Sequence, residues 1–84
     1  MSYSIEFSPK ARRQFHKLSP AVQLQLGKAI EQLATEPRSV NCKKMYGINA
    51  WRLRTGKYRV VYEIHDGILL ILVLALGHRR DVYR

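Results

Sequence analysis

The sequence predicts an α+β fold with the element order β-α-α-β-β-β, in which a helical hairpin packs on one face of an antiparallel-rich sheet. Three observations support this prediction: polar and apolar residues alternate near the N-terminus, apolar stripes at helical spacing reach residue 34, and strand-like apolar runs occupy residues 51–76. A chain of 84 residues has room for one domain, which we expect to span residues 1–84.

The first half of the chain supplies one strand and both helices. Residues 3–7 alternate in polarity, which predicts a strand with one buried face. Ser8-Pro9 and Ser19-Pro20 each place a capping serine before a proline, so a helix is expected to begin at each pair. The first helix should run to about Leu18, and the second should end before Pro37.

The second half supplies the remaining strands. Residues 37–49 show no clear period and are interpreted as a loop that carries Lys43 and Lys44. Three strands are expected after this loop, over residues 51–54, 58–64 and 68–76. A turn at Gly56 and a hairpin turn at residues 65–67 would separate them, and Gly77 would end the last strand.

The charge of the chain indicates a polyanionic partner. Fifteen Lys and Arg residues against six Asp and Glu residues give a formal net charge of +9. Charge alone leaves nucleic acid, an anionic membrane surface and an acidic protein open as partners. The nine-residue apolar run over 68–76 is about half as long as a membrane helix, so no membrane span is expected.

Cysteine and histidine usage argues against a metal or disulfide framework. Cys42 is the single cysteine in the sequence, and the three histidines show no zinc-ligand spacing, so we expect neither a metal nor a cofactor. Glu6 and the basic residues at 10–13 interrupt any signal-peptide pattern. A reduced, cytoplasmic location is therefore expected.

Strand alternation is expected to gather basic side chains on one surface. Arg52 and Arg54 share one face of their strand. In the next strand, Arg59 and Tyr58 project to opposite faces, so Arg59 can lie on the same surface as Arg52 and Arg54. Solvated outward residues of a half-exposed sheet would give the same pattern. Clustered like charges repel, however, and a bound phosphate would relieve that cost.

The C-terminal segment 77–84 combines arginines with His78 and Tyr83. A solvated tail is one interpretation, but Val82 and Tyr83 favour docking of the segment. Attack of a ribose 2′-OH on its phosphate needs a proton acceptor, cations for the developing charge and a proton donor. Arginines suit the charge, His78 is a conventional acid or base, and Tyr83 would need help from neighbouring cations, so both proton carriers stay open.

Several segments together resemble a RelE-type toxin of the RelE/ParE toxin–antitoxin superfamily. They are "FSPKARRQFHKLSPAVQLQLGKAIEQL", "KKMYGINAWRLR", "WRLRTGKYRVVYEIHDG" and "LGHRRDVYR", which span nearly the whole chain in the family's order. The resemblance implies a RelE-like, microbial-ribonuclease-like fold. It also implies a metal-independent endoribonuclease that cleaves messenger RNA in the decoding site of the ribosome, inhibits translation, and is neutralised by a cognate RelB-like antitoxin.

The resemblance further implies roles for individual residues. Arg59 matches the arginine at the scissile phosphate, Arg79 the second essential arginine, and Tyr83 the C-terminal tyrosine. With His78 these form the predicted catalytic set, and the predicted RNA-binding set comprises Arg52, Arg54, Lys43, Lys44, Lys57, Arg80 and Arg84. The sequence departs from some members in two ways. The position of the earlier of two lysines that those members carry falls near Ala50 here, and the chain stops at Arg84 without the further C-terminal helix that some members possess.

Two other functions share these features. A ParE-like inhibitor of DNA gyrase would use the same fold and a basic surface for protein contacts. A non-catalytic RNA-binding module would bind phosphate through the arginines without cleaving. The compact tail with His78, Arg79 and Tyr83 favours RNA cleavage over both.

Overall fold

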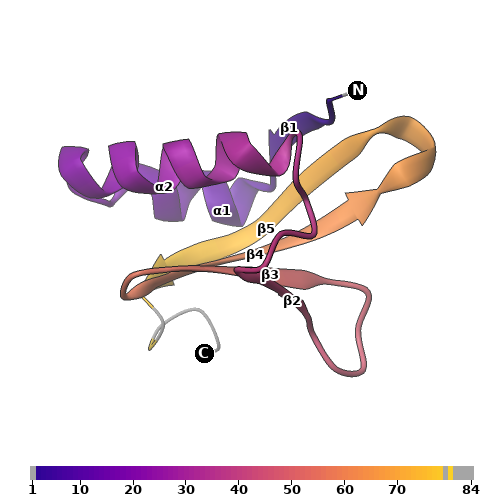
Figure 1. Cartoon of the computed structure of the whole chain (residues 1–84). Coiled ribbons are helices and arrows are strands. Elements are labelled where there is room, and N and C mark those ends of the chain that lie inside the picture. The colour runs from indigo at the N-terminus through magenta and orange to yellow at the C-terminus, as the bar shows by residue number, and fades with distance from the viewer. Residues whose placement is uncertain (1, 79, 81–84) are drawn as a thin grey trace.

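The computed structural model describes residues 2–78 and 80, and over this part of the chain it forms two α-helices and one five-stranded sheet (Figure 1). The elements are β1 (Ser4–Phe7), α1 (Pro9–His16), α2 (Pro20–Leu33), β2 (Cys42–Lys44), β3 (Trp51–Thr55), β4 (Tyr58–His65) and β5 (Leu70–His78). The strand order is β1-β5-β4-β3-β2, with β1 parallel to β5 and the other neighbours antiparallel. The predicted α+β fold is confirmed.

Both helices begin where the Ser-Pro pairs predict. The Ser8 hydroxyl oxygen accepts a hydrogen bond from the Ala11 amide at 3.1 Å, and Ser19 caps α2 in the same way at 3.4 Å. The Ser8 hydroxyl also donates to the Leu74 carbonyl at 2.9 Å, which joins the start of α1 to β5. This contact fixes the helical hairpin against the centre of the sheet, so that it covers one face (Figure 1).

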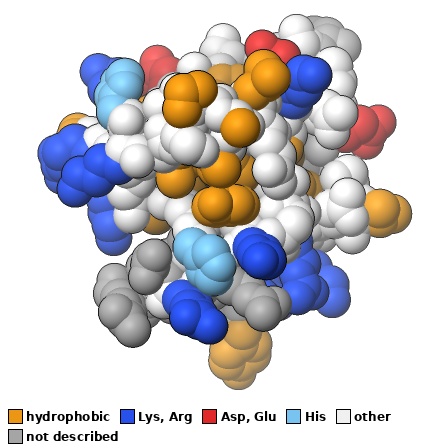
Figure 2. Space-filling view, turned by 90° about the vertical axis from the view of Figure 1, so that its left-hand side faces the viewer, with side chains coloured by type: hydrophobic (Ala, Val, Ile, Leu, Met, Phe, Trp, Pro, Cys, Tyr) orange, Lys and Arg blue, Asp and Glu red, His pale blue; other side chains and the backbone are white. Residues whose placement is uncertain are grey.

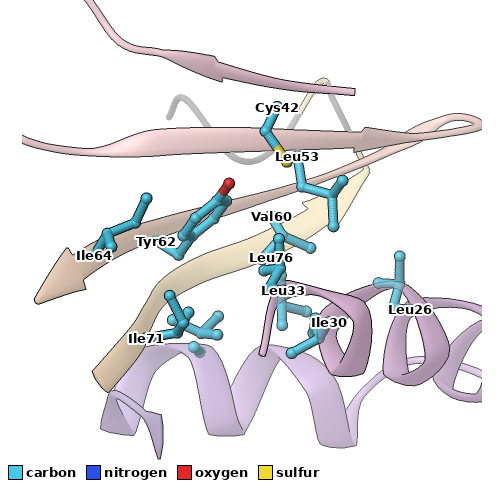
Figure 3. Packing of buried hydrophobic residues seen from close by; sticks show 12 residues of the cluster. Leu26, Ile30, Leu33, Cys42, Leu53, Val60, Tyr62, Ile64, Ile71 and Leu76 are labelled. Carbon is cyan, nitrogen blue, oxygen red and sulfur yellow. The ribbon is translucent and has the colours of Figure 1, made fainter. Parts of the chain in front are cut away.

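The main core lies between α2 and the inner face of the sheet (Figure 3). Leu26, Ile30 and Leu33 recur at helical spacing and are at most 3 % exposed, because they form the stripe of α2 that faces the strands. The sheet residues that meet this stripe include Leu53, Val60, Tyr62, Ile71, Val73 and Leu76.

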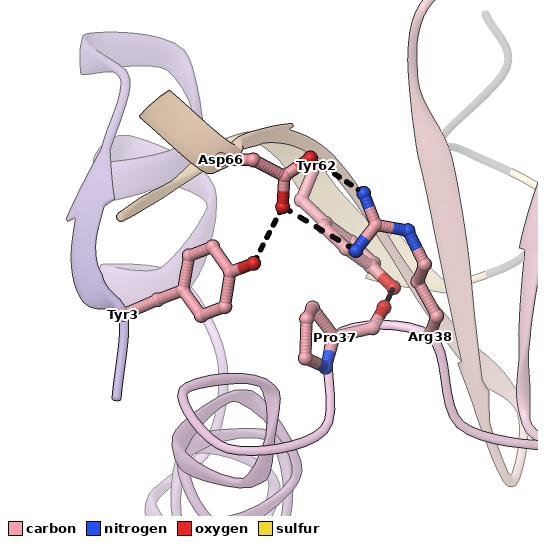
Figure 4. Close-up of polar contacts among 5 residues, drawn as sticks. All are labelled: Tyr3, Pro37, Arg38, Tyr62 and Asp66. Carbon is pink, nitrogen blue, oxygen red and sulfur yellow. Dashed lines mark hydrogen bonds and ion pairs between the residues drawn. The ribbon is translucent and has the colours of Figure 1, made fainter. Parts of the chain in front are cut away.

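Tyr62 is the largest fully buried side chain of the core, and its hydroxyl donates to the Pro37 carbonyl at 2.6 Å (Figure 4). Burial is the main reason why the pKa of Tyr62 is raised. Tyr62→Phe would leave the buried carbonyl unsatisfied, so we expect the free energy of unfolding to fall by about 1 to 3 kcal/mol. Urea denaturation would measure this; unchanged stability would show that another group satisfies the carbonyl.

A polar cluster ties the segment before β2 to the turn between β4 and β5 (Figure 4). Asp66 accepts a hydrogen bond from the Tyr3 hydroxyl at 2.5 Å and pairs with the Arg38 guanidinium at 2.8 Å. The hydrogen bonds from Arg38 and, to a smaller extent, from Tyr3 lower the pKa of Asp66. The Arg38 guanidinium also lies 5.6 Å from the centre of the Trp51 ring. These exposed contacts add little stability, but they orient the chain entering β2.

The loop interpretation of residues 37–49 was wrong over residues 42–44, which form β2. Cys42 pairs with Leu53 and is buried, while Lys43 and Lys44 pair with Arg52 and Trp51. Three residues are too few for a period to show in the sequence, and the backbone pairing with β3 supplies the missing stability.

The end of the last hairpin also differs from expectation. β4 and β5 form the expected hairpin, but Asp66–Ile68 is a 3₁₀ turn and Leu69 takes a left-handed conformation with φ 51° before β5 begins at Leu70. Gly77 does not end the strand: it pairs with Arg59, and β5 continues to His78. The final pairs of β4 with β5 therefore lie directly beside the predicted site.

A β-bulge in β5 exchanges the faces of the residues that follow it. Val61 pairs with Ala75 but Tyr62 pairs with Val73, which leaves Leu74 as the extra residue. Val73 and Leu76 both face the main core in consequence, whereas Ala75 packs with Val61 on the other face. The bulge thus decides which side of the sheet each of the last strand residues occupies.

Within the described residues, neither helix combines the length and apolar character required to cross a membrane.

Candidate functional site

A group of four cations occupies the face of the sheet opposite the helices. We define this basic face by Lys43, Arg52, Arg54 and Arg59. Lys43 pairs directly with Arg52, and Arg54 pairs directly with Arg59. Directly paired residues project to the same side of a sheet, so β2, β3 and β4 present all four side chains together. The predicted grouping of the three arginines is confirmed, and β2 adds Lys43 to it.

The basic face lines a depression of about 540 Å³. Its other lining residues, Val40, Asn41, Thr55 and Gly56, are uncharged, so each charged residue of the lining is a cation. A volume of this size lies in the range of small-ligand sites. The depression is therefore a place where an anionic group of nucleotide size fits among several cations.

Electrostatics within the basic face favour a bound anion. Arg54 and Arg59 stand directly opposite one another, and cations gathered on one surface create a positive potential that attracts anions. Glu63 lies on the same face of β4, about 13 Å along the strand from Arg59. The Glu63 carboxylate lies 2.9 Å from the ring nitrogen of His65, at the end of β4 that is distant from Arg59.

Arg59 is partly enclosed at the basic face. The residue is half-buried and its Nε atom is inaccessible to solvent, whereas Arg54 is exposed. A second small apolar cluster of Ala50, Val61 and Ala75 lies on this side of the sheet. A guanidinium held by burial is oriented before a ligand arrives, which strengthens its effect on a developing charge.

The structure places the other predicted RNA-binding residues at separate positions. Lys44 is exposed in β2, but it pairs with Trp51 and therefore projects to the side of the sheet opposite Lys43. Lys57 is exposed in the turn between β3 and β4. Arg80 is exposed, and its amide donates to the His78 ring at 3.3 Å. Arg79, Tyr83 and Arg84 lie outside the described residues. Figure 2 shows Lys and Arg side chains along the left-hand side of the molecule as well as over its lower part.

His78 is placed on the other side of the sheet from Arg59. It pairs with Tyr58, and the two rings lie edge to face with their centroids 5.8 Å apart. Tyr58 packs against the main core on the helix side. The structure therefore does not bring the His78 ring together with the basic face, because the bulge at Leu74 has reversed its direction.

Sequence reasoning missed the contribution of the segment before β2. Val40 and Asn41 line the depression, and the Asn41 carbonyl accepts a hydrogen bond from the Arg54 amide at 3.1 Å. A chain segment without periodicity carries little signal for such a role. The part of the chain that the structure describes contains no group of three or more His, Cys, Asp or Glu residues arranged to hold a metal ion.

Comparisons with known proteins agree with this geometry. Residues 5–83 match the family model described as the ParE toxin of the type II toxin–antitoxin system parDE. The chain is 33 % identical to toxin RelG of Mycobacterium tuberculosis, covering 100 % of this chain and 99 % of the relative. It is 30 % identical to the mRNA interferase toxin RelE of Escherichia coli K12, covering 99 % and 92 %.

A solved structure shares the fold over almost the same length. The toxin–antitoxin complex RelBE2 from Mycobacterium tuberculosis contains a chain that superposes with a TM-score of 0.86 at 28 % identity. The match covers 94 % of this chain and 100 % of that chain. The sheet and its two helices are thus common to both.

Proposed function

Because the chain belongs to the RelE/ParE family of type II toxins, we propose that it is a ribosome-dependent endoribonuclease that cleaves messenger RNA in the decoding site. The observation that carries this proposal is the basic face, where Lys43, Arg52, Arg54 and Arg59 line one depression. The relative from Escherichia coli is named an mRNA interferase, which favours RNA as the bound polyanion.

The chemistry that the basic face supports is attack of a ribose 2′-OH on the adjacent scissile phosphate. The new bond from phosphorus to O2′ replaces the bond to the 5′-oxygen of the next nucleotide, which leaves as an alcohol once it is protonated. Arg59 would contact the phosphate and stabilise the charge that builds on its oxygens, because burial of its Nε atom limits the freedom of the side chain. Arg54 and Arg52 would hold adjacent phosphates. By the family pattern, Arg79 would add a second cation and Tyr83 would move the proton. Each step uses side chains and the 2′-OH itself, so the proposal needs no metal.

The partners follow from the same features. An acidic RelB-like antitoxin would cover the cations, and the structure of a related toxin–antitoxin complex supports a partner of this kind. The ribosome would supply a message held in line for attack, since proximity and orientation contribute a large part of such a rate. A cytoplasmic location follows from a ribosomal substrate.

The test is to map the ends of cellular messages by primer extension after brief expression of the chain. The proposal predicts new ends within translated codons, and prevention of those ends when the antitoxin is co-expressed. Because the matching family model is described as a ParE toxin, supercoiling by purified DNA gyrase should be measured in parallel. Gyrase inhibition with intact messages would contradict the proposal and support the ParE-like alternative.

A further inference from the structure

The hairpin that joins β2 to β3 extends away from the helices (Figure 1). A hydrogen bond of 2.8 Å from the Met45 amide to the Ala50 carbonyl closes its stem. Ala50 is 2 % exposed, and Met45 packs beside it against the small cluster that contains Val61 and Ala75. The base of the hairpin is therefore held on the sheet, and residues 46–49 form its projecting tip.

Tyr46 stands at this tip with its side chain fully exposed. A tyrosine normally buries much of its ring, as Tyr62 does in this chain. Gly47 follows with φ 81°, a left-handed conformation that favours glycine and turns the chain directly after the ring. The small or uncharged neighbours Gly47 and Asn49 leave the surroundings of the ring open.

The basic face leads from Arg59 toward this tip. Arg59 in β4 pairs with Arg54 in β3, and Arg52 lies two residues nearer the tip along β3. Arg52 in turn pairs with Lys43 in β2, three residues before Tyr46. The row of cations therefore reaches the stem of the hairpin that carries the exposed ring. Proteins bind single-stranded nucleic acid by combining such cations, which contact phosphates, with exposed aromatic rings, on which bases stack.

We propose that Tyr46 stacks on an unpaired base of the same message strand whose scissile phosphate lies at Arg59. This inference rests on the proposed function and adds to it a contact with a flanking nucleotide. An antitoxin segment is the competing occupant of the tip. The row of cations favours RNA, because it offers phosphate contacts from Arg59 to Lys43, three residues before the ring.

The experiment measures binding of the full-length chain to a fluorescent single-stranded RNA whose 2′-O-methyl riboses block cleavage. We expect Tyr46→Ala to weaken binding by about tenfold or more, and Tyr46→Phe to bind like the wild type, because the ring supplies the stacking. Tyr46→Leu should behave like Tyr46→Ala. Ile48→Ala is the matched control, since it removes an exposed apolar side chain from the same tip and should change little.

Three further readouts separate stacking from other roles. The salt dependence of binding should stay the same in Tyr46→Ala but decrease in Lys43→Gln, since only the second variant loses a phosphate contact. An RNA that lacks one base at the stacked position should bind Tyr46→Ala and the wild type equally. On programmed ribosomes, Tyr46→Ala should raise KM and leave kcat unchanged.

Two results would overturn the inference. One is equal RNA affinity of Tyr46→Ala and the wild type; the other is a loss confined to the affinity for purified antitoxin. Failure of the proposed function would be a separate result. In that case the wild-type chain would produce no new message ends within codons, while the comparison of RNA affinities between Tyr46→Ala and the wild type would still test the stacking contact.

Discussion

Replacing Arg59 by alanine is expected to lower the rate of message cleavage on programmed ribosomes by about 10²- to 10³-fold, because a preoriented cation at the developing charge is lost. The fold should be retained. Arg59 lies on the face of the sheet opposite the main core, so its removal leaves the core packing in place. Single-turnover cleavage and urea denaturation of the same preparations would measure both effects.

Two control variants make the Arg59 result specific. Arg13→Ala removes the same charge from an exposed position on α1, far from the basic face in the fold, and should leave cleavage almost unchanged. Arg59→Lys keeps the charge but loses the planar fork, so it should recover only part of the rate. A stable Arg59→Ala variant that still cleaves at the wild-type rate would show that the phosphate is bound elsewhere.

The elements that the sequence predicts well are those with a long, local signal. Ser8 and Ser19 mark the helix starts because the capping interaction lies within four residues of chain. Alternation within β3 and β4 places Arg52, Arg54 and Arg59 on one face, because each strand keeps its period of two over these positions.

The features that escaped prediction depend on pairing between distant segments. β2 exists because residues 42–44 pair with β3, and this pairing adds Lys43 to the basic face. The direction of His78 depends on the extra residue Leu74, whose carbonyl is held by the Ser8 hydroxyl 66 residues earlier. Strand alternation cannot reveal such a bulge, since one inserted residue reverses every later side chain.

This reversal bears on which residue moves the proton. The His78 ring lies against Tyr58 on the helix side, while a phosphate at Arg59 would lie on the other side of the sheet. Tyr83 lies outside the described residues, and its role as proton carrier rests on the family pattern. The geometry therefore places the His78 imidazole away from the basic face, and Tyr83 stays a prediction from the family pattern.

Tyr83→Phe is accordingly expected to lower single-turnover cleavage on programmed ribosomes by about 10²-fold or more, because it keeps the ring and removes the hydroxyl. His78→Gln should cost much less and should be visible mainly as a small loss of stability from the contact with Tyr58. A larger loss in His78→Gln than in Tyr83→Phe would assign the proton to the imidazole. Small losses in both variants would assign most of the catalysis to the arginines and to the alignment of the 2′-OH by the ribosome.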